Sequence, residues 1–338
     1  MTEVSPVSIG IIGAGEITRK LHLPVLLSMP EVQVAWLWDR RDSQAEMVGR
    51  AHHVKWLSPA ISQSIPECDV ALLAIPIEAR AQYLDIFAQR NTAVLCEKPF
   101  AASRDQHQQL IDAFPGHRLA AGYQRRFHQS TALLRRILAE GWFGPLHRIR
   151  LAEGDRSRGS GVDHSFLDDG QGGATRGVLF DLGTHGVDLI LYITSATGFR
   201  VLSSDVVLDG RIDRRVSARA TLLGVESAGP DGVDLDFCVS WLDRQANIIE
   251  LHFERATVWC NLSPAAEVFV GDPARPAQCV RVSGGSGATT PNQAFYLEWR
   301  EFLRGVREQQ PSMLSARTSL LTTELMEELL ARGGSTHG

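Results

Sequence analysis

The stretch Val7-Ser-Ile-Gly10-Ile-Ile-Gly13-Ala14-Gly15-Glu16-Ile17-Thr18 decides the fold of this chain. A short, continuous apolar run predicts a buried strand, and the Gly-x-Gly turn after it leads into a segment with helical character. Gly13 permits the tight turn, and Gly15 lets the backbone approach a pyrophosphate, which the free N–H groups of the helix N-terminus then bind. Thr18 stands at the third glycine position, so the motif is incomplete. The expected cofactor-binding residues of this stretch are Gly13, Ala14, Gly15, Glu16 and Ile17.

A second apolar run, residues 32–38, ends at Asp39. A carboxylate at that strand end can receive the 2′-hydroxyl of an adenosine ribose, and it would repel the 2′-phosphate of NADP. Arg40 and Arg41 follow immediately, and a guanidinium there can instead stack on adenine or pair with that phosphate. Because the carboxylate holds the strand-end position, we expect NAD, with NADP as the alternative.

The alternation of strands and helices continues to about residue 126. Strands are expected at 69–75, 93–96 and 118–122, with helices at 79–89 and 104–114 between them. This alternation of strands and helices predicts βαβ units with right-handed crossovers and a parallel sheet. Ligands collect at the carboxyl ends of such strands. Pro76, Lys98 and Tyr123 fall at these ends, so we expect Lys98 beside the nicotinamide ring.

The second cluster of candidate residues lies in Gly177-Val-Leu-Phe-Asp181-Leu-Gly183-Thr-His185-Gly-Val-Asp188. On a helix, Asp181, His185 and Asp188 step by four and then three, so they share a face. A carboxylate fixes the tautomer of an imidazole, and a lysine can hold or protonate an alcohol oxygen. Lys98, Asp181 and His185 are therefore the predicted catalytic residues. Taken alone, an Asp–His pair at this spacing is also typical of a solvated helix surface.

Composition places the chain among ordinary enzymes. Its 338 residues, 44% of them hydrophobic, can fill two cores, and a net charge of -5 without a basic stretch disfavours nucleic acid as a partner. No apolar run approaches the roughly 18–20 residues that span a bilayer, and no signal-peptide profile is present. The five cysteines lack metal-binding spacing, so we expect reduced thiols, no metal site and a cytoplasmic location.

The pattern changes after residue 126, so domains are predicted at 1–126 and 127–338. A helix is expected at 130–140, a strand at 145–152, a polar loop at 153–176 and a helix at 181–195. Seven segments with strand character follow, at 201–208, 217–223, 233–241, 248–253, 256–261, 267–270 and 279–282. Successive strands without helices predict a largely antiparallel sheet. One face should carry the 181–195 helix, and the other is available to a second subunit in a homodimer or homotetramer.

The chain resembles the Gfo/Idh/MocA oxidoreductases over nearly its whole length. The motifs that carry the resemblance are Gly13-Ala14-Gly15, Glu97-Lys98-Pro99, Gly122-Tyr-Gln-Arg-Arg126-Phe127 and Asp181-x-Gly-x-His185-x-x-Asp188. The resemblance implies a Rossmann domain joined to an α/β domain with an open mixed sheet. It also implies a nicotinamide cofactor, a sugar-like or cyclitol substrate and a cis peptide bond before Pro99. It matches Lys98 to the family's catalytic lysine, and Asp181 and His185 to its acid/base pair.

The resemblance extends the set of site residues. Further cofactor contacts are expected from Arg40, Pro76, Glu97, Lys98 and Gln124. Substrate contacts are expected from Lys98, Tyr123, Arg126, Arg156, Arg158, Asp181 and His185. The chain also departs from the family pattern, since Arg80 replaces a frequent histidine and His128 a common proline. The arginines of the 153–176 loop are either solvated charges or ligands of an anionic substrate group.

The reaction expected from these residues is reversible hydride transfer between nicotinamide and a secondary alcohol or ketone. His185, oriented by Asp181, handles the hydroxyl proton while Lys98 polarises the oxygen, and either group can return the proton in reduction. Three alternatives stay open: reduction of a C=N or C=C bond, a regulator that binds the dinucleotide without catalysis, and a glycosidase that uses tightly held NAD.

Overall fold

The computed structural model describes residues 5–58, 65–114, 116–156 and 177–337. The chain divides into two compact units. The first comprises Met1–Ala101, Asp105–Tyr123 and Pro291–Ser319, and the second comprises Ala102–Arg104, Gln124–Thr290 and Leu320–Gly338. The division expected at residue 126 does not account for Pro291–Ser319, which lies late in the chain but belongs to the first unit.

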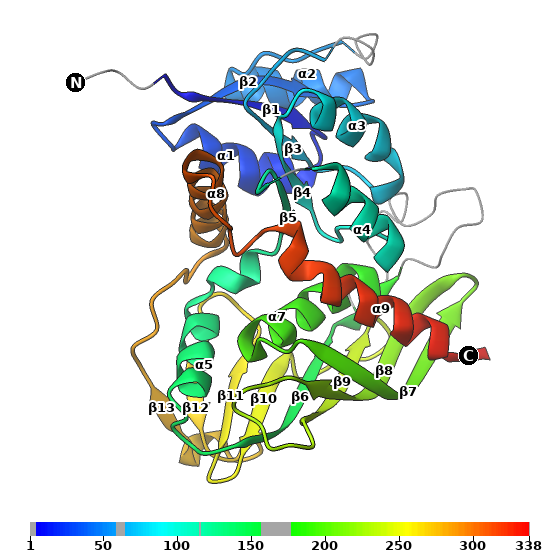
Figure 1. Cartoon of the computed structure of the whole chain (residues 1–338), viewed down its shortest axis with the longest axis vertical. Coiled ribbons are helices and arrows are strands. Elements are labelled where there is room, and N and C mark those ends of the chain that lie inside the picture. Colours follow the sequence, from blue (N-terminus) through cyan, green and yellow to red (C-terminus); the bar gives the residue numbers. More distant parts are fainter. Residues whose placement is uncertain (1–4, 59–64, 115, 157–176, 338) are drawn as a thin grey trace. The chain divides into compact units, whose positions relative to one another are not determined.

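The first unit is built on a five-stranded parallel sheet with the order β2-β1-β3-β4-β5 (Figure 1). Its strands are β1 (Val7–Ile12), β2 (Val32–Trp38), β3 (Val70–Leu73), β4 (Ala93–Glu97) and β5 (Leu119–Gly122). The chain runs from β1 to β2 on one side and then to β3 on the other. The loops after β1 and β3 therefore diverge, which is where doubly wound sheets bind their ligands.

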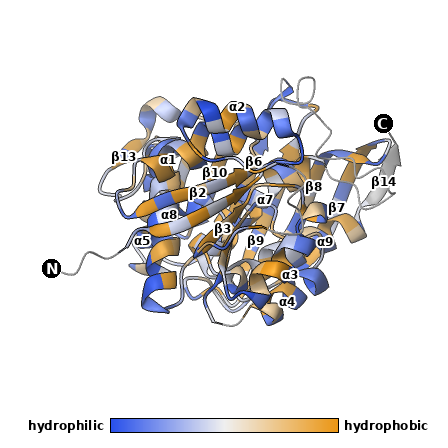
Figure 2. Ribbon diagram, turned by 90° about the horizontal axis from the view of Figure 1, so that it is seen from above, coloured by the Kyte–Doolittle hydropathy of each residue, from blue (hydrophilic) through white to orange (hydrophobic). Residues whose placement is uncertain are grey.

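Helices flank this sheet. They are the π-helical turn η1 (Thr18–His22) with α1 (Leu23–Leu27), α2 (Asp42–His52), η3 (Ile77–Ala79) with α3 (Ala81–Gln89), α4 (Arg104–Ala113), α8 (Pro291–Glu308) and η8 (Ala316–Ser319). Figure 2 shows the amphipathic division of these layers, because β3 in the interior is orange while the outer helix α2 carries both blue and orange residues. Strands β3, β4 and β5 are buried throughout, as their continuous apolar runs predict.

Helix α8 is a long element that was not predicted from the sequence. Its apolar side chains Phe295, Trp299 and Phe302 are at most 2% exposed, and the helix packs on α1 and η1. Burial of these three aromatic rings explains why the segment belongs to the first unit, since each contributes on the order of 2 kcal/mol of apolar burial.

The second unit contains a nine-stranded sheet with the order β13-β12-β11-β10-β6-β9-β8-β7-β14. Its strands are β6 (Leu146–Gly154), β7 (Gly198–Asp209), β8 (Ile212–Leu223), β9 (Val233–Ser240), β10 (Ile248–Phe253), β11 (Thr257–Asn261), β12 (Val268–Val270), β13 (Val280–Val282) and β14 (Gly334–His337). The pairs β6–β9 and β7–β14 are parallel and the other neighbours are antiparallel. The expectation of a mainly antiparallel sheet is confirmed.

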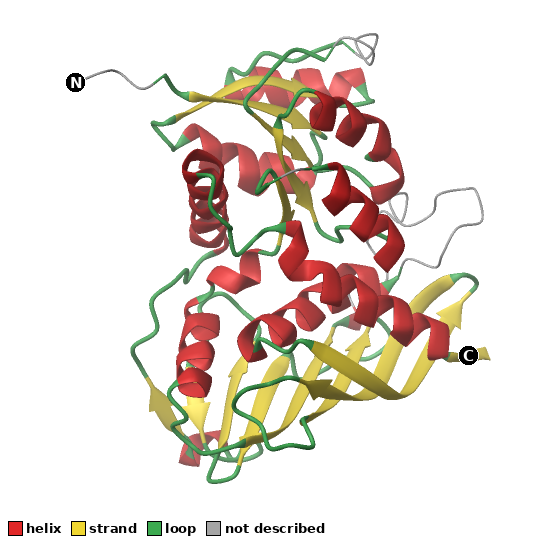
Figure 3. Ribbon diagram, viewed as in Figure 1, coloured by secondary structure: helices red, strands yellow, loops and turns green. Residues whose placement is uncertain are grey.

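One face of this sheet is covered by helices (Figure 3). They are η4 (Gln124–Phe127), α5 (Gln129–Ala139), η6 (Leu179–Gly183), α7 (Thr184–Thr194) and α9 (Leu320–Arg332). Helix α7 lies close to the strands at Gly186, where a Cβ would meet Leu151 at 3.1 Å and Phe237 at 3.2 Å. The expectation that the helix bearing Asp181 and His185 packs on the sheet is therefore confirmed.

Candidate functional site

The carboxyl edge of the first sheet gathers the predicted residues of the first unit. Because its strands are parallel, the glycine turn after β1, Asp39 after β2, Pro76 after β3, Lys98 after β4 and Tyr123 after β5 all lie at this edge. Pro76 is exposed and Lys98 is half-buried, whereas Tyr123 is only 1% exposed. The edge thus presents a loop surface in which Lys98 is a partly accessible cation.

The glycine turn is shaped by two different constraints. Gly13 has φ 104°, and a Cβ there would collide with the carbonyl oxygen of Ala74. A Cβ on Gly15 would meet no protein atom within 4 Å, so internal packing does not require glycine at that position. Close approach of a phosphate does require it, and the following helix N-terminus supplies N–H donors. Thr18 fills the third glycine position by bonding its hydroxyl to the Gly13 carbonyl at 2.6 Å.

Asp39, which is expected to receive the ribose, also braces this turn. Its Oδ2 accepts the N–H of Ala14 at 2.8 Å and its Oδ1 accepts the N–H of Arg41 at 2.9 Å. Gln44, which the sequence analysis missed, donates to the Ala14 carbonyl at 2.8 Å. Each carboxylate oxygen keeps a second lone pair, so Asp39 can still accept a hydroxyl hydrogen bond. Arg40 is exposed beside it, and these residues together fit a dinucleotide.

The predicted cis peptide bond between Lys98 and Pro99 is confirmed. Glu97, the last residue of β4, accepts the backbone N–H of Lys98 at 3.0 Å and a ring nitrogen of His22 at 2.7 Å. Burial alone would raise the pKa of Glu97, but the His22 hydrogen bond and the Lys98 charge outweigh it and lower that pKa. The carboxylate of Glu97, an expected cofactor contact, thus has internal partners.

A buried hydrogen-bond relay connects Glu97 with helix α8. The indole N–H of Trp299 donates to Nδ1 of His22 at 3.0 Å, and an indole nitrogen can only donate. Nδ1 of His22 is therefore unprotonated, and Nε2 carries the proton that it donates to Glu97. His22 lies in the π-helical turn that follows the glycine turn. In the sequence, this relay is indicated only by His22, a histidine on the apolar side of that helix.

The helix that carries Asp181 and His185 begins at an acidic cap. Asp213 on β8 is fully buried and accepts the backbone N–H groups of Gly177 at 2.6 Å and Leu179 at 2.7 Å. Burial raises the pKa of Asp213 to about 7, while these backbone donors oppose the shift. The structure places Asp181 and His185 one turn apart across the junction of η6 and α7, with His185 7% exposed.

Arg126 and Asp188 form a buried ion pair in the second unit. Arg126 donates from Nε to Asp188 Oδ2 at 2.9 Å and from Nη2 to Oδ1, and the two side chains are 2% and 1% exposed. Arg126 is expected from the sequence to contact the substrate, but in the structure it binds an internal carboxylate, because a buried charge needs a partner. Asp188 therefore holds η4 against α7.

The remaining expected contacts have different environments. Gln124 begins η4 and is half-buried. Arg156 is exposed and donates to the Leu242 carbonyl at 2.8 Å. Glu16 is exposed and pairs with Lys20. Arg158 lies outside the described residues, as do Asp163, His164 and Arg176.

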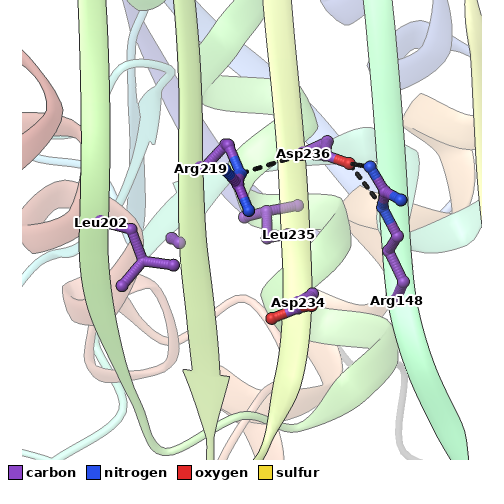
Figure 4. Close-up of a pocket in the computed structure, with 7 residues that line it drawn as sticks. Arg148, Leu202, Arg219, Asp234, Leu235 and Asp236 are labelled. Carbon is purple, nitrogen blue, oxygen red and sulfur yellow. Dashed lines mark hydrogen bonds and ion pairs between the residues drawn. The ribbon is translucent and has the colours of Figure 1, made fainter.

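A small cavity of about 70 Å³ lies on the second sheet (Figure 4). It is lined by Arg148, Leu202, Arg219, Ala220, Asp234, Leu235 and Asp236. Asp236 accepts from Nε of Arg148 at 2.5 Å and lies 3.8 Å from Nε of Arg219, so the charges are mutually paired. A volume that holds only a few water molecules is too small for a sugar. This cavity is therefore a feature of the sheet surface and not a candidate active site.

The first unit has the parallel sheet and the glycine turn of a dinucleotide-binding Rossmann domain. Residues 7–123 match the model described as "Oxidoreductase family, NAD-binding Rossmann fold", that of Gfo/Idh/MocA. Over these residues, about a third of its length, the chain is similar to the Gfo/Idh/MocA oxidoreductases. Among the residues that the structure describes, no helix is both long and apolar enough to cross a membrane.

Relatives of known name are distant. D-Glucoside 3-dehydrogenase of Escherichia coli is 26% identical over 194 residues, which are 56% of this chain and 54% of that protein. A putative UDP-kanosamine synthase oxidoreductase subunit of Amycolatopsis mediterranei is 25% identical over 264 residues, 72% of this chain and 71% of that protein. The chain spans little more than half the length of several curated relatives it matches.

A solved structure with the same fold is that of KijD10, a 3-ketoreductase from Actinomadura kijaniata in complex with TDP-benzene and NADP. It aligns with a TM-score of 0.79 over 99% of this chain and 100% of that one, at 17% identity. At this identity the likeness establishes the fold.

Proposed function

We propose that this protein is an NAD(P)-dependent oxidoreductase that interconverts a secondary alcohol and a ketone on a sugar derivative. The observation that carries the proposal is the place of Lys98, a half-buried cation at the carboxyl edge of the sheet whose backbone N–H is held by Glu97. A cation beside a nicotinamide is suited to polarise the oxygen of an alcohol or ketone.

The substrate proposed is a hexose derivative that reacts at its third carbon. Three relatives carry that position in their names, namely D-glucoside 3-dehydrogenase, glucose-6-phosphate 3-dehydrogenase and the 3-ketoreductase KijD10. Arg156, together with Arg158 of the polar loop, suits an anionic group on the substrate, since arginine binds oxyanions through two donors. NAD is the proposed cofactor, because Asp39 at the ribose position would repel a 2′-phosphate.

The nicotinamide supplies the hydride chemistry when the cofactor is bound. The residues of the chain then handle the proton. In oxidation, His185 removes the hydroxyl proton while Asp181 orients the imidazole and stabilises its cationic form. The ammonium of Lys98 stabilises the negative charge that develops on the oxygen. In reduction the proton returns from Lys98 or from His185.

The test is a substrate screen that follows the absorbance of the reduced cofactor. Methyl glucosides, glucose 6-phosphate, a UDP-sugar, cyclitols and a cyclic imine are each supplied with NAD or NADP, in both directions where possible. Turnover of a glucoside or sugar phosphate, with at least about a hundredfold loss in Lys98→Met, is expected. Turnover of the imine alone would favour the imine reductase. Cofactor that stays bound with no net turnover of any compound would favour the regulator or the glycosidase that uses tightly held NAD.

We also propose that the helix-free face of the second sheet joins two copies of the chain. Arginines and aspartates alternate on this face, and a two-fold axis can set each arginine of one copy against an aspartate of the other. Arg148, Arg219 and Asp236 lie there, and the rings of Trp259 and Phe269 stack at 4.7 Å on the neighbouring strands. Sedimentation of the wild type and of Arg219→Glu tests this assignment, and a monomeric wild type would refute it.

A further inference from the structure

Arg80 is a buried arginine that joins two loops of the carboxyl edge. It follows η3 directly and is 3% exposed. Its Nε donates to the carbonyl of Ile75 at 2.9 Å, in the loop after β3. Its Nη1 donates to the carbonyls of Pro99 at 2.7 Å and Phe100 at 3.2 Å. These last two residues belong to the lysine loop, defined here as residues 98–100.

The geometry of these bonds restricts the lysine loop. A buried guanidinium is tolerated only when its donors are satisfied, and three backbone carbonyls serve that purpose here. The guanidinium is a rigid planar fork, so its two donor nitrogens hold the loops after β3 and β4 at a fixed separation. A lysine ammonium is a single point on a flexible stem and cannot bridge the loops in the same way.

The backbone of the lysine loop is therefore held from both ends. Glu97 accepts the N–H of Lys98 at 3.0 Å, and Arg80 binds the carbonyls of the next two residues. Phe100 is 1% exposed, which anchors the end of the loop in the core. Arg80 thus restrains the backbone from which the Lys98 side chain extends.

We propose that Arg80 is a positioning residue that sets the placement of the Lys98 ammonium. This inference rests on the proposed function, in which Lys98 stabilises the reacting oxygen. Rates of this kind are sensitive to displacements of about 1 Å, so a loosened loop should lower turnover more than it lowers cofactor affinity.

Arg80→Met removes the bridge with little change of stem length. Arg118→Met is the matched control, because Arg118 donates a comparable 2.8 Å bond to the Asn91 carbonyl at the opposite, amino edge of the same sheet. The chain has only three lysines, Lys20, Lys55 and Lys98. After reductive methylation with ¹³C-formaldehyde, Lys98 therefore gives one of three lysine signals in an NMR spectrum, and Lys98→Met assigns it.

The proposal expects the Lys98 signal to shift or broaden in Arg80→Met and to stay in place in Arg118→Met. This measurement needs no substrate. An unchanged Lys98 signal in a folded Arg80→Met protein would overturn the proposal. If Arg80→Met fails to fold, Arg80→Gln, which keeps two donors, is measured in its place with the same two outcomes.

Kinetics with the substrate found in the screen separate this proposal from the proposed function. Arg80→Met is expected to lower kcat at least about tenfold with little change in cofactor Kd, and to cost less than about twofold when Lys98 is already methionine. Equal losses in both backgrounds would show that Arg80 acts independently of Lys98 and overturn the inference. Near-normal turnover in Lys98→Met alone would instead overturn the role of the lysine in the proposed function.

Discussion

Protonation of His107 is expected to destabilise the first unit below neutral pH. His107 lies on α4 and is fully buried, with its ring 4.3 Å from that of Phe100 at the end of the lysine loop. Its Nε2 lies 2.9 Å from the carbonyl oxygen of Ala316, to which it donates. Burial lowers the pKa of His107 to about 4, while the Ala316 carbonyl opposes the shift.

The pKa of His107 in the unfolded chain and its pKa in the native protein together give the sign and size of the destabilisation. In the unfolded chain the imidazole takes a proton near pH 6.5, but in the native protein only near pH 4. The stabilising contribution of neutral His107 is therefore complete above about pH 6.5 and is lost as the pH falls toward 4. One pKa unit corresponds to about 1.4 kcal/mol, so the full loss is about 3 kcal/mol. Between about pH 7 and pH 5 the loss is about 2 kcal/mol.

Urea unfolding at pH 7 and pH 5 measures this contribution when the wild type is compared with His107→Gln. The glutamine amide can donate to the same carbonyl but does not titrate. The wild type should lose about 2 kcal/mol more than the variant over this range. The same loss in both proteins would refute the reasoning, since it would mean that His107 is not held neutral by its surroundings.

Three further predictions test the hydrogen-bond relay from Trp299 to Glu97, the choice of cofactor and the Asp181–His185 pair. Trp299→Phe removes the donor to Nδ1 of His22, so it should lower the free energy of unfolding by about 1–3 kcal/mol in chemical denaturation, and no measurable loss would contradict the assigned tautomer. Asp39→Asn keeps an acceptor for the glycine turn but removes the charge, so the ratio of catalytic efficiencies should shift toward NADP; a wild type that already prefers NADP would reverse our assignment. Asp181→Asn and His185→Asn should each lower kcat strongly. If the two residues act as one unit, kcat of the double variant should fall by much less than the product of the two single losses, and a fall equal to that product would show that they act independently.

Much of the secondary structure could be predicted because local patterns determine it. The strand expected at 248–253 is β10 (Ile248–Phe253), and the helix expected at 130–140 is α5 (Gln129–Ala139) within one residue. Helix α8 was overlooked although Phe295, Trp299 and Phe302 recur at the i, i+4, i+7 spacing of an amphipathic helix. That local pattern does not show that the helix packs on α1. The domain that contains α8 could not be read from chain order for the same reason.

In the candidate site, too, local features could be predicted from the sequence and contacts between distant residues could not. By itself the sequence determined the strand-turn-helix around Gly13 and Gly15, the carboxylate at Asp39 and the placement of Lys98 at a strand end, because backbone geometry and apolar periodicity are local properties.

Only the tertiary structure decided which polar groups are bound to one another. It joined Trp299 to His22, Arg126 to Asp188 and Arg80 to the lysine loop. These contacts connect residues far apart in the chain, and they form because a buried polar or charged group must find a partner wherever the fold brings one. Sequence spacing carries no record of that partner, so these supporting contacts could not be predicted from the sequence.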